Sequence, residues 1–438
     1  MGIINAIARK GADILDDAHV YGAERGAVSR RNMLFGAYAS SVVTVMTTGV
    51  YLTGFCLALG ADANYINTVV VFITVCSMAQ IFAPILLDRV RKRRNLIISM
   101  LCAGNAINLV LIPVLVFAGV PDNVMLPLFT FLISVVTILG SLASPGIMAW
   151  HIGNISEEKR LGFFSFLMIT SVVVSCLSPF LGGIIADRLA EVFGESVSLS
   201  LIRLAMVVFA ALALFFFYRV DEPEYAENTE KFSPAGILRG VRAHPEYLSV
   251  ILSIFMWSMS ASIPGMYIYV LLLDDFEISY TFFNSVNLFY IILVIALTPV
   301  WKRIASKHKI HNTMFIAMFL FTFHVVGYLI LSKKALFMFP ISEVYAQIFA
   351  VGINLCFTLA PYINLPTHNR TMFLSLYNTV AALAGIIGLF IGRIIFELSY
   401  GVELPFGIDR YRLILIVMAV LLIITAFVSR VGLREREA

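Results

Sequence analysis

The chain has 438 residues, of which 60% are hydrophobic and 13% are charged, with a formal net charge of +4 and a mean hydropathy of +0.91. A soluble globular domain is about 25% charged, so the composition excludes a chain that faces water over most of its surface. Uncharged stretches of about 20 residues are long enough to cross a bilayer as helices. The sequence therefore predicts an all-α polytopic membrane protein.

Apolar runs with few or no charges follow one another along the chain and predict twelve membrane-spanning helices. They lie at residues 33–59, 66–87, 96–119, 124–150, 161–186, 199–218, 247–273, 279–301, 313–332, 336–363, 371–397 and 411–429. A polar, proline-containing stretch at 219–247 separates six spans from six and has the composition of a linker. We therefore expect these parts in order: an N-terminal segment (1–32), a six-helix bundle (33–220), a linker (221–246), a second six-helix bundle (247–431) and a short tail (432–438).

Lys and Arg residues are distributed unequally between the two faces of this topology. With the N-terminus inside, 24 of the 31 basic residues fall on the inner face and five on the outer face, while Arg203 and Arg393 lie within spans. Basic loops stay on the cytoplasmic side of a membrane. Both termini and the central linker are therefore predicted to be cytoplasmic.

Residues 2–18 carry isoleucine and leucine at helical spacing, with charged residues on the other face. This pattern predicts an amphipathic helix ahead of the first span. The helix lies either at the membrane surface or on the protein's own cytoplasmic loops, and acidic residues on its polar face weigh against simple attraction to anionic lipid.

A weak internal repeat relates the two halves. Pro84 precedes the basic loop 89–94, and Pro299 precedes a second basic loop 215 residues later. The segment RLGFFS, which starts at Arg160, matches RTMFLS, which starts at Arg370, 210 residues later. The repeat favours two parallel six-helix bundles, an arrangement that serves transport by rocking one half against the other.

The stretch PILLDRVRKRRN, residues 84–95, joins the second and third predicted spans. Its Asp-Arg pair and basic tail (Asp88, Arg89, Arg93 and Arg94) resemble the loop motif G-x3-D-R-x-G-x-R-R/K of the major facilitator superfamily (MFS) of secondary transporters, with Pro84 and Arg91 in place of both glycines. The resemblance implies the twelve-helix MFS fold and a loop that packs against the opposite bundle, where Asp88 meets helix ends or basic groups. The alternative is a basic loop that only sets topology.

The segment SPFLGG in the fifth span resembles the G-P-x-x-G-G segment of antiporters in this superfamily, with Ser178 in place of glycine. Pro179 is expected to kink the helix, while Gly182 and Gly183 let another backbone approach closely. Glycine and proline are also common in any membrane helix. The fourth span has no basic residue, which weighs against proton coupling through the arginine that other members carry there.

The resemblance implies that the first, fourth, seventh and tenth spans line a central cavity. Their candidate lining residues are hydroxyl, aromatic or carboxamide side chains: Tyr38, Ser41, Thr44, Thr48, Thr137, Ser141, Trp257, Tyr267, Tyr345, Gln347 and Asn354. Asn284, Asn287 and Tyr290 in the eighth span are weaker candidates. Such a lining suits neutral, polyhydroxylated or amphipathic molecules, although Ser and Thr also mediate helix packing in membranes.

Glu343 and Arg393 are charged residues at membrane depth, which makes them candidates for function. Glu343 is either a carboxylate that binds and releases a coupling proton or one side of an outer gate with Arg393; the alternative is a static ion pair. Arg393 can equally pair with Glu397, four residues further along the same helix. His324, within the ninth span, is interpreted as structural.

The sequence thus favours a secondary active transporter that moves a small organic solute by alternating access, coupled to protons or sodium, with uptake and export both open. The alternatives are a proton-driven drug or amphiphile exporter, a transporter-like sensor and an intramembrane enzyme. No phosphate-binding loop, HExxH, CxxC or serine-nucleophile motif occurs, so we expect no enzymatic activity, cofactor or metal site. We expect a monomer in the plasma membrane, with no nucleic-acid partner.

Overall fold

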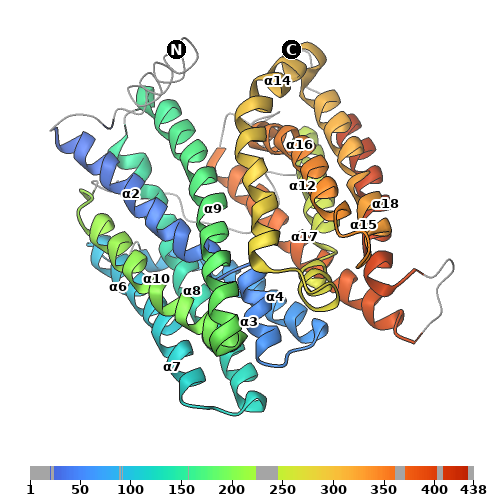
Figure 1. Ribbon diagram of the computed structural model, residues 1–438. Coiled ribbons are helices and arrows are strands. Elements are labelled where there is room, and N and C mark those ends of the chain that lie inside the picture. The colour runs from blue at the N-terminus through green and yellow to red at the C-terminus, as the bar shows by residue number, and fades with distance from the viewer. Residues whose placement is uncertain are drawn as a thin grey trace, which may run out of the picture. The chain divides into compact units, whose positions relative to one another are not determined.

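The computed structural model describes residues 20, 24–87, 90, 92–155, 157–222, 245–360, 370–401 and 408–432. This described part is built of helices and contains no strand (Figure 1). The amphipathic helix expected at 2–18, most of the linker and the tail beyond Gly432 lie outside it. The all-α prediction is therefore confirmed for the described residues.

The helices of the N-terminal half of the sequence include several that change type along their length. They are α2 (Arg25–Val45), α3 (Val50–Ala58), α4 (Ala63–Ser77), the 3₁₀ helix η1 (Met78–Phe82), α5 (Ala83–Leu87), α6 (Arg93–Ala106), the π-helix η2 (Ile107–Leu111), α7 (Ile112–Phe117), α8 (Asp122–Asn154), α9 (Glu157–Phe193) and α10 (Glu195–Tyr218).

The helices of the C-terminal half also include a segment that changes type. They are α12 (Pro245–Ser262), α13 (Tyr267–Val270), the π-helix η3 (Leu271–Asp275), α14 (Tyr280–Phe321), α15 (His324–Ile330), α16 (Met338–Leu359), α17 (Arg370–Leu398) and α18 (Arg410–Gly432).

Eleven segments of the described chain are long and apolar enough to cross a membrane. One of them, Tyr280–Ile330, has 51 residues and contains a non-helical residue, Lys309, with φ 62° and ψ 160°. A straight helix of that length would be about 77 Å long, against a hydrocarbon core of about 30 Å. Sequence analysis predicts two spans in this segment, and the count of twelve stays a prediction.

The chain divides into two compact units, and each takes in a short piece of the other half of the sequence. Unit 1 contains Met1–Ala61, Val75–Glu227 and Ser279–Asn284, whereas unit 2 contains Asp62–Thr74, Asn228–Ile278 and Ser285–Ala438. The first part of α4 thus belongs to unit 2, and the first turn of α14 belongs to unit 1.

In unit 1, α2 packs against α9 and α10, and α6 packs against α8. The core between them contains Met33, Ile97, Phe163 and Phe217, all nearly inaccessible. A Cβ atom on Gly36 would lie 2.7 Å from the Phe217 ring, so a glycine is needed where α2 meets α10.

In unit 2, α12 packs against α17 and α18, and α15 packs against α16. Cβ atoms on Gly388 and Gly392 would lie 2.1 and 2.0 Å from the carbonyl oxygens of Met259 and Ile263. The missing side chains therefore allow the backbones of α12 and α17 to touch, as small residues do between membrane helices.

The outer surface carries large apolar side chains of a kind that water-soluble proteins bury. Phe131, Ile292 and Leu398 are 64%, 65% and 75% exposed. Helices satisfy their own backbone hydrogen bonds and can therefore present such side chains to lipid. The chain is a multi-pass membrane protein, as the composition predicts.

Candidate functional site

The first predicted span of each half is broken within the membrane segment. Helix α2 ends at Val45 and α3 starts at Val50, and α12 ends at Ser262 and α13 starts at Tyr267. Sequence analysis expects unbroken runs there. Gly49 (φ 57°) and Gly265 (φ 50°) adopt backbone angles that favour glycine. Discontinuous membrane helices expose backbone polar groups to other helices or to ligands.

In unit 1 the break places Tyr51 at the centre of a polar contact. Its hydroxyl donates to the carbonyl oxygen of Pro179 (2.5 Å), and its ring stacks on Tyr280 with centroids 5.4 Å apart. The amides of Tyr280 and Thr281 donate to the two carboxylate oxygens of Asp187 (3.1 and 2.8 Å). An acidic group at this helix start is favourable because the helix N-terminus carries partial positive charge.

The SPFLGG segment has a packing explanation in this contact. A Cβ atom on Gly182 would lie 2.1 Å from the Met46 methyl, and one on Gly183 would lie 2.9 Å from the carbonyl carbon of Tyr280. Gly183 faces backbone atoms and is therefore needed for the close approach that the sequence predicts, whereas the flexible Met46 side chain can move away from a larger residue at position 182. The conformational role that the resemblance implies for this segment stays a prediction.

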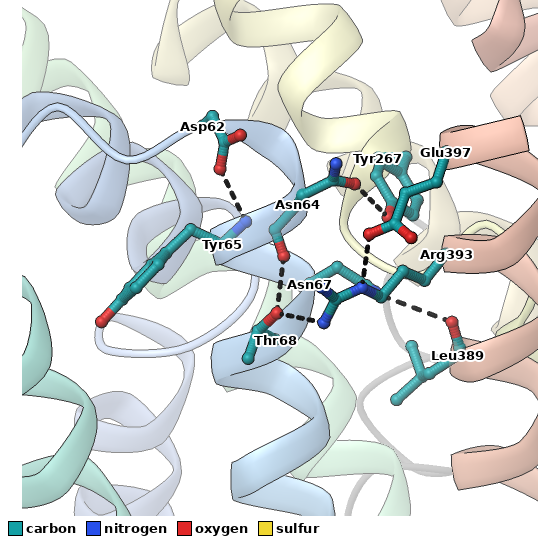
Figure 2. A network of polar contacts seen from close by, with 9 residues as sticks. All are labelled: Asp62, Asn64, Tyr65, Asn67, Thr68, Tyr267, Leu389, Arg393 and Glu397. Atoms are coloured by element: carbon teal, nitrogen blue, oxygen red, sulfur yellow. Dashed lines mark hydrogen bonds and ion pairs between the residues drawn. The ribbon is translucent and has the colours of Figure 1, made fainter. Parts of the chain in front are cut away.

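Unit 2 holds an equivalent network, drawn in Figure 2. Arg393 donates through Nε to Glu397 (2.8 Å) and through Nη1 to the hydroxyl of Thr68 (2.9 Å), so α17 is tied to α4. The Tyr267 hydroxyl donates to Asn64 Oδ1 (3.0 Å). The pairing of Arg393 with Glu397 that four-residue spacing predicts is present.

Two further contacts fix the start of α4 in this network (Figure 2). Asp62 precedes the helix and accepts the amide of Tyr65 (2.8 Å), as an N-cap does. Asn67 is fully buried and donates to the carbonyl oxygen of Leu389 in α17 (3.3 Å). Its Oδ1 would lie 2.8 Å from a Cβ on Gly265, so the broken helix passes directly beside it.

Glu343 lies in a separate network of unit 2. Tyr328 donates a hydrogen bond to its carboxylate. The neighbouring Ser342 donates to the carbonyl oxygen of His324 (2.5 Å), whose ring nitrogen lies 2.6 Å from the carbonyl oxygen of Phe321. Across the described residues no basic side chain pairs with Glu343, and Arg393 is not brought to it.

The hydroxyl candidates of unit 1 are mostly engaged by their own helices. Thr44, Thr48 and Thr137 donate to carbonyl oxygens four residues earlier, at 3.0, 2.8 and 2.8 Å. Such bonds occupy the hydroxyl proton and leave only acceptor capacity. Tyr38 instead reaches the hydroxyl of Thr170 in α9 (2.5 Å). Ser41 and Ser141 are half-buried on α2 and α8.

Besides Tyr267, the candidates of unit 2 divide into two groups. Trp257 lies against the rings of Phe321 and Phe357, and Tyr345 donates to the carbonyl oxygen of Leu320 (3.0 Å), so both contribute to packing. The others form side-chain pairs between α16 and α14: Gln347 with Asn287 (3.3 Å) and Asn354 with Tyr290 (3.1 Å). The structure thus pairs two candidate lining residues, Gln347 and Asn354, with two of the weaker candidates of the eighth span.

The basic loop is described only in part, because Asp88 and Arg89 lie outside the described residues. Arg93 begins α6. The amide of Arg94 donates to Glu222 (3.1 Å), and its guanidinium lies 4.8 Å from the centre of the Tyr218 ring. The visible end of the loop therefore contacts the end of α10. The contact with the opposite bundle that the resemblance implies stays a prediction.

Sequence reasoning missed the surroundings of one buried charge. Arg203 is 2% exposed, donates to Asn108 (2.5 Å) and lies over the rings of Phe55 and Phe129 at 4.6 and 5.6 Å. Asn108 belongs to the π-helix η2, a helix type that is often found at functional positions. A charge within a span is the signal that could have singled out Arg203.

The model of the Major Facilitator Superfamily matches residues 33–389 of the chain. Among solved structures, the chain is similar to an inward-facing bacterial homologue of the iron transporter ferroportin, with TM-score 0.70, 14% identity and 92% of this chain and 98% of that chain covered. It is also similar to a mutant of the nucleoside transporter NupG (TM-score 0.69, 12% identity, 93% and 100% covered). A D-xylose–proton symporter gives TM-score 0.65 at 15% identity, with 94% and 98% covered. No curated protein sequence matches the chain.

Proposed function

Because the chain belongs to the Major Facilitator Superfamily, we propose that it is a secondary active transporter which moves a small organic solute by alternating access and couples that movement to protons. Its family and its structural similarity to solved transporters support transport rather than catalysis. We place it in the cytoplasmic membrane as a monomer, with both termini inside.

The proposed topology has twelve spans. The backbone kink at Lys309 divides the longest apolar segment, Tyr280–Ile330, into two parts, each about long enough to cross the membrane. The basic side chains near this kink belong to the face that the positive-inside rule assigns to the cytoplasm.

The observation that carries the proposed coupling is the bond from Tyr328 to the Glu343 carboxylate. Glu343 lies five residues into the span that begins at Met338, or about 8 Å along the helix. An ionised carboxylate is costly in an apolar environment and is relieved by binding a proton. A hydroxyl donor stabilises the ionised form instead. No basic side chain pairs with Glu343 in the described part of the chain. Its apolar surroundings therefore favour the protonated carboxyl group, while the bond from Tyr328 favours the ionised one.

Arg393 is proposed to act in gating rather than in coupling. It ties α17 to α4 through Thr68 and is about one third exposed, so its contact can break and form again. Arg393 thus keeps the gating role that the sequence suggests, with Thr68 in place of Glu343 as its partner.

Flux into proteoliposomes tests the proposed class. A panel of neutral and charged solutes is offered with an inward proton gradient, an outward proton gradient, a sodium gradient or no gradient. We expect accumulation of at least one solute that follows the proton gradient. Saturable flux that ignores every gradient would make the protein a facilitator, and flux that follows sodium alone would reassign the coupling ion.

A further inference from the structure

The seam between α14 and α16 in unit 2 contains a carboxamide with one polar end unpaired. Gln347 is 8% exposed, and its Nε2 donates to Asn287 Oδ1 at 3.3 Å. Its Oε1 is buried and has no partner among the described residues. Turning this amide alone by half a rotation would bring its oxygen against Asn287 Oδ1, which also accepts, so the existing bond would be lost.

A buried amide oxygen without a partner destabilises the protein, because the oxygen has lost its hydrogen bonds to water and makes none within the protein. The bond that Gln347 does make is also long for an N–H···O contact and is therefore weak. A ligand group that enters the seam could satisfy the free end and replace the weak bond. The arrangement therefore points to a ligand.

A second polar pair continues the row along the same seam. Asn354 lies two helical turns beyond Gln347, about 10 Å along α16, and donates to the Tyr290 hydroxyl (3.1 Å). Asn287 and Tyr290 lie one turn apart on α14. Asn354 is exposed, Asn287 and Tyr290 are half-buried, and Gln347 is buried. The row thus runs from an open end to a closed end.

The seam has a rigid support. A Cβ atom on Gly352 would lie 2.5 Å from the Trp301 indole, so α16 approaches α14 as closely as a glycine permits. The indole N–H donates to the carbonyl oxygen of Ile348 (3.0 Å). Binding groups held by such packing are already in place before a ligand arrives.

We propose that this row, comprising Gln347, Asn287, Asn354 and Tyr290, binds a neutral solute with neighbouring hydroxyl groups. Carboxamides and phenol hydroxyls donate and accept, as sugar, polyol and nucleoside hydroxyls do. The row itself contains no ionisable acid or base that would favour a charged solute. This inference rests on the proposed transport function, for which it names the substrate class.

Ligand-induced stabilisation of the purified full chain in detergent tests the substrate class. The probes are D-xylose, myo-inositol and uridine, which separate sugar, polyol and nucleoside sources, with choline and L-glutamate as charged comparisons. We expect at least one neutral probe to raise the melting temperature in a saturable way. The inference is overturned if no neutral probe does so, or if only a charged probe does.

Variants test the site itself. Gln347→Met has nearly the same size but no amide, so we expect an unliganded melting temperature equal to or above that of the unmodified protein, with binding of the neutral probe weakened about tenfold or more. Tyr290→Phe should weaken binding less. Thr298→Val is the matched control on α14, because its hydroxyl donates to Val294 on its own helix (2.6 Å).

Unchanged binding by both Gln347→Met and Tyr290→Phe would overturn the assignment. The two proposals fail separately: a neutral probe that binds at this row but crosses membranes without regard to the proton gradient contradicts the coupling and leaves the binding site intact.

Discussion

Tyr51 in unit 1 and Tyr267 in unit 2 lie 216 residues apart and occupy the same place in their halves. Each follows by two residues the glycine at which the first helix of its half is broken. Each donates its hydroxyl to a neighbouring helix, Tyr51 to the backbone of Pro179 and Tyr267 to the side chain of Asn64. Both halves thus place a tyrosine hydroxyl on a neighbouring helix directly after the break in their first helix.

The two contacts differ at one equivalent position. Gly183 and Arg393 are 210 residues apart; the first lets α9 touch the backbone of Tyr280, and the second reaches Thr68 with a charged side chain. Backbone contact in unit 1 leaves no side chain to rotate away. The contact in unit 2 depends on a long and partly exposed side chain. We infer that unit 2 carries the contact that opens more readily.

The largest effect on folding is expected when Gly183 of unit 1 is replaced by arginine, the residue at the equivalent position 393 of unit 2. Gly183→Arg must displace the backbone of Tyr280, which a Cβ would already approach to 2.9 Å. Overpacking costs typically about 1–3 kcal/mol and occasionally more, and a whole arginine side chain against a backbone lies at the upper end, so we expect loss of monodisperse protein in size-exclusion chromatography. Gly140→Ala is the control, because a Cβ there meets nothing within 4 Å. Normal yield of Gly183→Arg would contradict the backbone contact.

A smaller effect is expected from removing the two tyrosine hydroxyls. Tyr51→Phe and Tyr267→Phe should each destabilise the protein by about 1 kcal/mol, as measured by thermal unfolding in detergent. The cost should be larger for Tyr51, because its hydroxyl also accepts a hydrogen bond from Asn284 Nδ2 (3.4 Å). If Tyr267→Phe proves the costlier change, the rigid contact lies in unit 2 instead.

The smallest effect concerns the tie between Arg393 and Thr68. A double-mutant cycle with Arg393→Met and Thr68→Val should give a coupling energy of about 0.5–1 kcal/mol, since the arginine is partly exposed. Transport turnover should change more than stability, because the contact is proposed to open in each cycle. Additive effects on stability would show that the two side chains do not interact.

Much of the architecture follows from local patterns in the sequence. Apolar runs and the basic loop beginning after Asp88 indicate the membrane class and the family, which the family match confirms. Four-residue spacing is enough to pair Arg393 with Glu397. These features depend on residues close together in the chain, where helical geometry fixes which side chains meet.

The remaining contacts depend on packing that no spacing encodes. Glu343 meets Tyr328 across the connection between α15 and α16, and Arg203 meets Asn108 over 95 residues of sequence. The break at Gly49 carries no distinctive local signal, because glycine is frequent in membrane helices, whereas Pro264 and Gly265 form a turn dipeptide that sequence analysis passed over. Sequence reasoning therefore found the residues of the candidate site more readily than their partners.

The central claim, that Glu343 carries the coupling proton, is tested most directly with Glu343→Gln in proteoliposomes that contain a solute transported by the unmodified protein. We expect that accumulation driven by a proton gradient is lost while exchange of labelled for unlabelled solute continues. Glu277→Gln is the control, because Glu277 pairs with Lys333 (3.0 Å) outside the membrane segments. Accumulation by Glu343→Gln at the rate of the unmodified protein would contradict the claim.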